Sequence, residues 1–140
     1  MKVQVIRSNR KTIGLEVRAD ESVILRAPAV DEISDVEWKS ILGEFTERVN
    51  HFCKIMEVTV GRITIRNQKT RWGSCSSKGN VNFNYQLYYM PRELMDYVII
   101  HELSHRRHMN HSAEFWQEVE KYCKTYRECR KKLRDYEIDP

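Results

Sequence analysis

The chain has 140 residues, of which 41% are hydrophobic and 31% are charged, and its formal net charge is +4. This length supports one domain with a hydrophobic core and argues against a second independent domain. No apolar run approaches the roughly 20 residues that span a bilayer, and the first residues lack the apolar segment of a signal peptide. The four cysteines form no C-x-x-C pair, so we expect reduced thiols, no membrane contact and a cytoplasmic location.

The chain opens with short segments in which apolar and polar residues alternate. They lie at residues 3–5, 13–17 and 23–25, and Pro28 ends the run. Alternation with a period of two is typical of half-buried strands, because successive side chains point to opposite faces. We therefore predict three short antiparallel strands at the N-terminal end.

A long helix is predicted after Ser34. Ser34 and Glu37 have the spacing of a capping box, and Ile33 and Trp38 have the spacing of a hydrophobic staple. One helical stripe is apolar and is typical of core packing; it consists of Trp38, Leu42, Phe45, Val49, Phe52 and Met56.

Two further strands are predicted in the second half of the chain. One begins at Ile63 and Ile65, and the other follows the turn at residues 78–80. Apolar side chains alternate along this second segment, which we expect to form a strand over residues 81–88. Strands followed by helices predict an α+β fold.

The segment from His101 to His105 reads H-E-L-S-H and lies in a predicted helix. Pro91 suits the first turn of that helix, and neither glycine nor proline interrupts it before the end of the motif. Two histidines four residues apart share one helix face, so both rings can reach a single Zn²⁺ at about 2.0–2.1 Å. Glu102 lies roughly 100° around the helix, where a carboxylate can contact a water on the metal without binding the metal. The pattern predicts a hydrolase that activates water on a metal ion.

The third metal ligand is less obvious. His108 shares the face of His101, but on a straight helix it lies about 7.5 Å along the axis from the midpoint of the other pair. His111 follows Asn110, a residue that tolerates left-handed conformations and often ends helices, so a chain that turns back there can return His111 to the metal. We favour His111; His108 is the main alternative, and Glu114 and Glu118 are weaker ones. Three protein ligands leave a fourth position open to water, as in catalytic zinc sites.

Several blocks in the same order resemble the YgjP-like metallopeptidase family, which consists of predicted metal-dependent hydrolases related to SprT-like and minimal zincin proteases. The blocks are residues 69–76 (KTRWGSCS), Asn84, residues 101–105 (HELSH), and residues 110–112 (NHS) with Phe115 and Trp116. Residues 7–12 are similar to the first hairpin of the family, so the resemblance covers nearly the whole chain.

The resemblance implies a zincin-like fold in which an antiparallel sheet packs on the metal-binding helix, with further helices C-terminal to it. It implies a single domain over residues 1–140, with N-terminal strands and a helix in 1–57 and the catalytic region in 58–140. It also implies His101, His105 and His111 as metal ligands and Glu102 as the catalytic carboxylate. Zn²⁺ is the expected metal, with Mn²⁺, Co²⁺ and Ni²⁺ as alternatives that imidazole ligands accept.

Residues for substrate binding are predicted with less support. In zincin-like folds a strand beside the active-site helix receives the peptide substrate, and the strand at residues 81–88 is the candidate here. Asn84 matches a family position and either meets substrate or holds the helix. Arg71 either binds a substrate carboxylate or phosphate, or braces its own loop.

The last helix carries a basic face formed by Lys121, Lys124, Arg127, Lys131 and Arg134. A solvated helix face is the simple interpretation, and attraction to nucleic acid is the alternative. Three functions follow: a zinc metallopeptidase acting on peptides or proteins, a phosphate-ester or nucleotide hydrolase with Arg71, Arg106 and Arg107 as anion clamps, and a non-enzymatic nucleic-acid-binding module with a structural metal. We favour the peptidase. The sequence specifies no oligomeric state.

Overall fold

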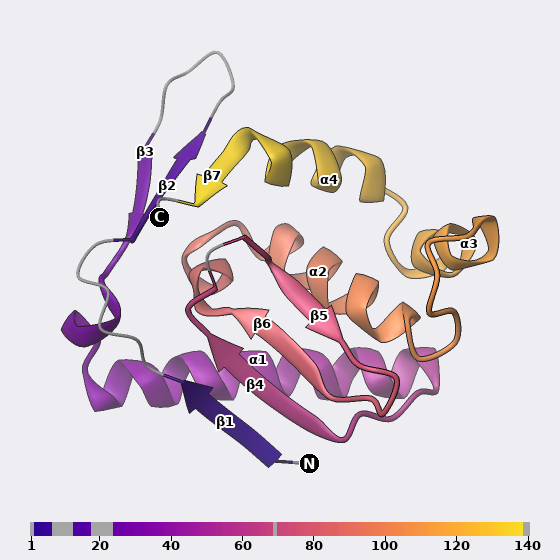
Figure 1. Cartoon of the computed structure of the whole chain (residues 1–140), viewed down its shortest axis with the longest axis horizontal. Helices are drawn as coiled ribbons and strands as arrows, with labels where there is room; N and C mark the ends of the chain where they lie inside the picture. Colours follow the sequence, from indigo (N-terminus) through magenta and orange to yellow (C-terminus); the bar gives the residue numbers. More distant parts are fainter. Residues whose placement is uncertain (1, 7–12, 18–23, 69, 139–140) are drawn as a thin grey trace.

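The computed structural model describes residues 2–6, 13–17, 24–68 and 70–138, which form two small sheets and four α-helices (Figure 1). The elements are β1 (Lys2–Ile6), β2 (Ile13–Val17), β3 (Ile24–Ala27), η1 (Val30–Glu32), α1 (Asp35–Met56), β4 (Arg62–Arg66), β5 (Gly73–Cys75), β6 (Val81–Asn84), η2 (Tyr85–Tyr89), α2 (Arg92–Ser104), α3 (Ala113–Tyr122), α4 (Tyr126–Asp135) and β7 (Tyr136–Ile138). The predicted α+β class is confirmed.

Helix α1 begins where the sequence predicts it. The Ser34 hydroxyl accepts a hydrogen bond from the backbone N–H of Glu37, which is the first half of a capping box. The Glu37 carboxylate accepts a hydrogen bond from the Tyr89 hydroxyl, so it links the start of α1 to η2. Ile33 and Trp38 are both buried, as expected for a hydrophobic staple.

The larger sheet has the strand order β1-β4-β6-β5 and is mixed. Strands β1 and β6 both run parallel to β4, and only β5 is antiparallel to its neighbour β6. The prediction of an antiparallel sheet is therefore wrong for this sheet. The reason is the long connection between β1 and β4, which contains α1 and lets the chain cross over before pairing in parallel.

The smaller sheet has the order β3-β2-β7 and is antiparallel. The predicted pairing of the second and third strands is confirmed. The first strand was expected beside them, but β1 belongs to the larger sheet. Strand β7 pairs with β2 at a position where the sequence indicated the end of a helix. Val23 and the segment at residues 7–12 lie outside the described residues.

Strand β6 is shorter than the sequence predicts. It ends at Asn84, whose side chain accepts a hydrogen bond from the backbone N–H of Gln86 and so caps the 3₁₀-helix η2. Tyr85 and Leu87 are fully buried in η2, so the alternation of apolar residues continues after the strand has ended.

Helices α1 and α2 both lie on one face of the larger sheet (Figure 1). The core between these layers includes Phe45 and Val49 of α1, Ile63 of β4, Phe83 of β6 and Ile99 of α2, all without exposed surface. This packing fixes α2 against β5 and β6. None of the described helices is long and apolar enough to cross a membrane.

Candidate metal centre

Helix α2 carries the first two histidines at its C-terminal end. His101 lies in the last turn, and His105 is the C-cap residue that follows Ser104. The two ring centroids are 5.2 Å apart, as the i, i+4 spacing predicts. The hydroxyl of Ser104, the last residue of α2, donates a hydrogen bond to the carbonyl of Ile100.

The chain then turns back and returns His111 to this end of the helix. His111 precedes Ser112, whose hydroxyl caps α3 by accepting a hydrogen bond from the N–H of Phe115. The expected reason for the turn is wrong: α2 ends at Ser104, well before Asn110, and among described non-glycine residues only Glu57 has a positive φ. The turn is instead built from residues 105–107 and the irregular segment after them.

The three histidines place their ring nitrogens close together. One potential ligand atom from each of His101, His105 and His111 lies within 4.8 Å of the other two. The Nε2 atoms of His101 and His111 are 3.3 Å apart. Two ligands at 2.0–2.1 Å from a tetrahedral ion are about 3.3 Å apart, so this spacing fits one metal ion.

Burial keeps the rings in the form that binds metal. Desolvation, with smaller contributions from His105 and His111, lowers the pKa of His101 to about 3. Desolvation also lowers the pKa of His105. Both imidazoles are therefore neutral near pH 7, and only a neutral imidazole has a lone pair for a cation.

Two outer contacts orient these rings. The His105 Nδ1 lies 3.0 Å from the carbonyl oxygen of His108, and the His101 Nδ1 lies 3.2 Å from the Tyr97 hydroxyl. Such contacts at Nδ1 leave Nε2 free for a metal, and they stiffen the ligand set. The ring of His108 itself is outside the cluster.

Aromatic side chains of α3 form the wall behind the histidines. Phe115 stacks on His105 with centroids 4.5 Å apart, and Trp116 stacks on His111 at 5.9 Å. Both aromatic residues contact the ring of His111 from the first turn of α3, so this helix helps to position the third ring.

Glu102 lies next to the histidine cluster in a buried position. Its side chain lines a cavity of about 350 Å³ together with His101, Tyr97 and Trp72. Desolvation raises the pKa of Glu102 to about 8, whereas the positive charge of Arg71 acts in the opposite direction. A carboxylate with this pKa can accept and release a proton near neutral pH.

Gly73 of β5 permits close packing of the strand on Glu102. A Cβ atom at this position would lie 3.1 Å from Cγ of Glu102, 3.1 Å from Cγ1 of Val98 and 3.0 Å from the carbonyl oxygen of Asn82. The glycine is therefore needed for close approach of the strand and not for a turn. Neighbouring Cys75 is half-buried, and desolvation is the main reason that its pKa rises to about 11, so its thiol is protonated at neutral pH.

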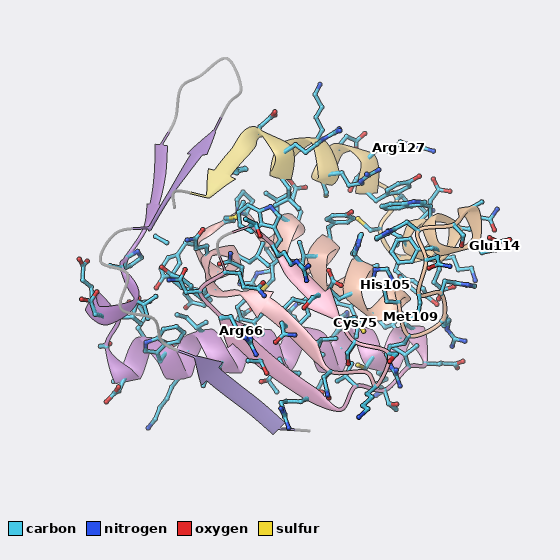
Figure 2. The ribbon with its side chains drawn as sticks, viewed as in Figure 1. Arg66, Cys75, His105, Met109, Glu114 and Arg127 are labelled. Atoms are coloured by element: carbon cyan, nitrogen blue, oxygen red, sulfur yellow. The ribbon has the colours of Figure 1, made fainter. Side chains whose placement is uncertain are left out.

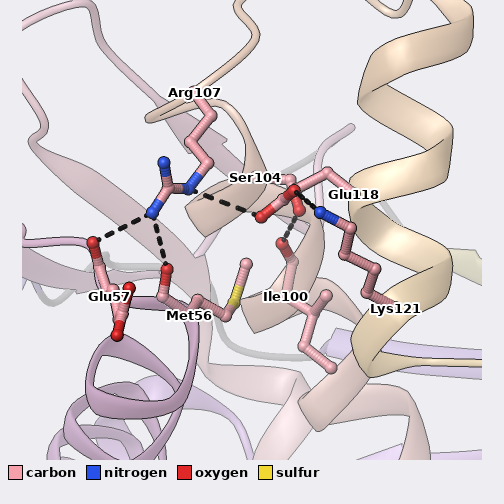
Figure 3. Close-up of polar contacts among 7 residues, drawn as sticks. All are labelled: Met56, Glu57, Ile100, Ser104, Arg107, Glu118 and Lys121. Atoms are coloured by element: carbon pink, nitrogen blue, oxygen red, sulfur yellow. Dashed lines mark hydrogen bonds and ion pairs between the residues drawn. The ribbon is translucent and has the colours of Figure 1, made fainter.

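The alternative acidic ligands are directed elsewhere. Glu114 lies at the outer side of α3 (Figure 2) and is exposed. Glu118 is buried, with carboxylate oxygens 3.5 Å from Arg107 and 3.2 Å from Lys121 (Figure 3). Arg107 also donates to the carbonyls of Met56 and Glu57, so it links the end of α1 to Glu118 of α3 (Figure 3).

The predicted substrate residues have different surroundings. Arg71 is exposed and lines the cavity. Asn84 is fully buried, and its amide donates to the carbonyls of Gln68 and Arg71, so it holds the segment that carries Arg71. Arg106, expected as an anion clamp in one hypothesis, donates instead to the carbonyl oxygens of Thr59 and Ser77.

Sequence reasoning missed Tyr97 and Arg130. Tyr97 precedes His101 by four residues, so the helical spacing could have indicated the contact. Arg130 was not singled out, although its guanidinium lies 4.4 Å over the Trp116 ring and lines the cavity. No sequence pattern relates α4 to this site, because the contact depends on how the two helices pack.

Comparison with known proteins agrees with this geometry. The crystal structure of the metallopeptidase zymogen abylysin of Pyrococcus abyssi is similar, with a TM-score of 0.58, 26% identity, and coverage of 64% of this chain and 90% of that chain. The crystal structure of Wss1 from Saccharomyces cerevisiae has the same TM-score of 0.58 at 12% identity, covering 93% of this chain and 90% of that chain, which shows a shared fold. No curated protein matches.

The strongest match is to a family. The sequence profile of the YgjP-like metallopeptidase domain matches residues 27–136, which include the histidine cluster, Glu102 and the cavity. These neighbours also confirm the zincin-like class predicted from the sequence. The chain belongs to the YgjP-like metallopeptidase family.

Proposed function

We propose that the chain is a zinc-dependent peptidase that uses Glu102 as its general base. The observation that carries this proposal is the convergence of His101, His105 and His111 within 4.8 Å of one another beside a buried carboxylate. Three imidazoles in this spacing suit Zn²⁺ and leave a fourth position for water. A purely structural site would not need Glu102.

The residues divide the work as follows. A bound zinc ion would polarise the substrate carbonyl and lower the pKa of a water molecule to about 7. Glu102 accepts a proton from the attacking water as the new C–O bond forms, and it delivers that proton to the amide nitrogen as the C–N bond breaks. Tyr97 and the His108 carbonyl hold the ligand rings in position during both steps.

Strand β5 is our candidate for the peptide-binding edge. The sequence suggested the strand at residues 81–88, but that assignment is wrong because β6 lies between β4 and β5. In the described part of the larger sheet, β1 and β5 are the edge strands, and β5 is the one that packs against α2. Its inward hydrogen bonds run through Trp72 and Ser76, so by antiparallel alternation the backbone groups of Gly73 and Cys75 face the open edge. A peptide paired there would lie beside Glu102.

The other hypotheses receive less support. Arg106 and Arg107 donate hydrogen bonds to the main-chain carbonyls of Thr59 and Met56, and neither is among the described residues that line the cavity. Two of the three expected phosphate clamps are therefore not at the site. The predicted basic face does not lie on a single helix, because Lys121 belongs to α3 and Lys124 to the segment between α3 and α4. That prediction is wrong, and the face gives no support for nucleic-acid binding. A cytoplasmic location stays a proposal that the four free cysteines support.

Peptide cleavage by the zinc-loaded chain tests the proposal. A complex peptide mixture is incubated with the parent protein and with Glu102→Gln, and new N-termini are identified by mass spectrometry. We expect cleavage by the parent and loss of at least about 100-fold in Glu102→Gln with equal zinc content. Equal cleavage by both proteins would exclude Glu102 as the base, and cleavage by neither would contradict the peptidase proposal.

A further inference from the structure

The cavity beside Glu102 has three arginines on its rim. Arg71 comes from the segment before β5, and Arg130 and Arg134 come from successive turns of α4. The cavity therefore lies between the edge strand and α4, with guanidinium groups contributed from both walls. Among the described residues that line it, Glu102 is the only acidic one.

Each arginine is available to a ligand or is turned toward the site. Arg71 and Arg134 are exposed and form no ion pair with any residue in the described part of the chain. Arg130 lies over the Trp116 ring at 4.4 Å, which fixes its guanidinium in place by a cation–π contact. Arg130 lines the cavity together with Tyr97 and His101.

The deeper wall of the cavity is apolar. Val98 is buried on α2, Leu133 is buried on α4, and Trp72 lies across from them. A volume of about 350 Å³ accommodates one side chain or a chain end, but not a folded partner or a duplex. An apolar wall with a ring of guanidinium donors suits a short carbon chain that ends in a carboxylate.

We propose that this cavity is a specificity subsite for a substrate carboxylate, so the peptidase prefers peptides with an acidic group next to the scissile bond. The carboxylate comes from an Asp or Glu side chain or from the C-terminus of the substrate. This inference rests on the proposed peptidase function and names its substrate class. Arg71, Arg130 and Arg134 are the specificity residues, since each can form charge-assisted hydrogen bonds with a carboxylate.

Fluorescein-labelled peptide pools test the inference without a known cleavage sequence. In each pool all positions vary except a central residue, which is Asp in the first pool and Asn in the second, both with an amidated C-terminus. A third pool keeps the Asn but ends in a free carboxylate. Cleavage is measured with the zinc-loaded parent, and binding is measured by fluorescence anisotropy with zinc-loaded Glu102→Gln.

We expect the Asp pool to be preferred over the Asn pool by about tenfold, mainly through KM, because one charge-assisted contact contributes about that much. Preference for the third pool instead would assign the subsite to the chain end. Arg134→Gln should bring the Asp:Asn ratio toward one. Arg134→Glu should cleave a pool with Lys as the central residue better than it cleaves the Asp pool. Lys131→Gln removes one positive charge from an exposed position of α4 outside the cavity and should keep the parent ratio.

The outcomes separate the two proposals. Cleavage of all pools at equal rates would overturn the carboxylate subsite while leaving the peptidase function intact. Preferred binding of an acidic pool without any cleavage would support the subsite and contradict the peptidase function. An equal fall of the Asp:Asn ratio in Lys131→Gln and Arg134→Gln would show a general charge effect and would also overturn the subsite.

Discussion

The Nδ1 atom of His105 lies 3.0 Å from the carbonyl oxygen of His108. Because a carbonyl oxygen only accepts hydrogen bonds, Nδ1 carries the proton and Nε2 keeps its lone pair. His108 thus contributes a main-chain atom to the histidine cluster, while its ring stays outside. The sequence alone left His108 and His111 as alternatives for the third ligand, and the structure gives them different places: the ring of His111 belongs to the cluster, and only the carbonyl of His108 contacts it.

Substitution of His111 and of His108 should therefore change zinc affinity by different amounts. We predict that His111→Ala weakens zinc binding by more than about 100-fold, because it removes a ring nitrogen from the cluster. His108→Ala keeps the carbonyl and should change the affinity by less than about tenfold. Competition with a chromogenic chelator measures both dissociation constants. The opposite ranking would exchange the roles of the two residues.

Glu102 should make the metal-free protein less stable as pH rises. Its pKa is raised from the ordinary 4.5 to about 8, so between these values the folded state holds a proton that the unfolded state has lost. Stability from this group is complete below pH 4.5 and is lost as pH rises toward 8. Glu102→Gln removes this dependence, and near pH 8 it should exceed the parent in stability by on the order of 4 kcal/mol.

Urea unfolding of both metal-free proteins across this pH range measures the effect. The two proteins should have similar stability near pH 4.5 and should diverge as pH rises. His101, with its lowered pKa, loses stability as pH falls from 6.5 toward 3, but it is present in both proteins and cancels in the difference. A difference that is constant with pH would show that Glu102 titrates normally in the folded state.

Gly73→Ala should impair catalysis more than metal binding. The added Cβ would lie 3.1 Å from Cγ of Glu102 and 3.0 Å from the carbonyl oxygen of Asn82, so Glu102 or the edge strand must shift by a few tenths of an ångström. We predict a fall in kcat of about tenfold at unchanged zinc content. Gly43→Ala is the matched control, since a Cβ there meets nothing within 4 Å. Equal kcat for both variants would contradict the close packing.

The local parts of this site could be predicted from the sequence, because they depend on spacing within one helix. The HELSH motif places His101 and His105 on one face, and Ser34 marks the start of α1, which the structure confirms. His111 was favoured because a chain can turn back, although α2 ends earlier than expected and Asn110 is not left-handed.

Long-range pairing could not be predicted. Alternation in β1 identifies a strand, but it does not reveal the partner of that strand. The partner is β4, which pairs in parallel and places Arg62 beside Lys2, sixty residues earlier in the chain. The edge position of β5 also follows from pairing, because its three residues carry no alternation of their own. Arg130 reaches the cavity because α4 packs beside it, and the spacing of residues in the sequence does not indicate how helices pack. The single-domain organisation over residues 1–140 stays a prediction.

Metal content per chain tests the central claim most directly. Protein without a tag is purified without chelators or added metal and analysed by elemental mass spectrometry, with His111→Ala prepared in parallel. We predict close to one zinc ion per chain in the parent and strong depletion in the variant. Folded parent protein that contains no metal and takes up none when zinc is added would contradict the histidine cluster as a metal site.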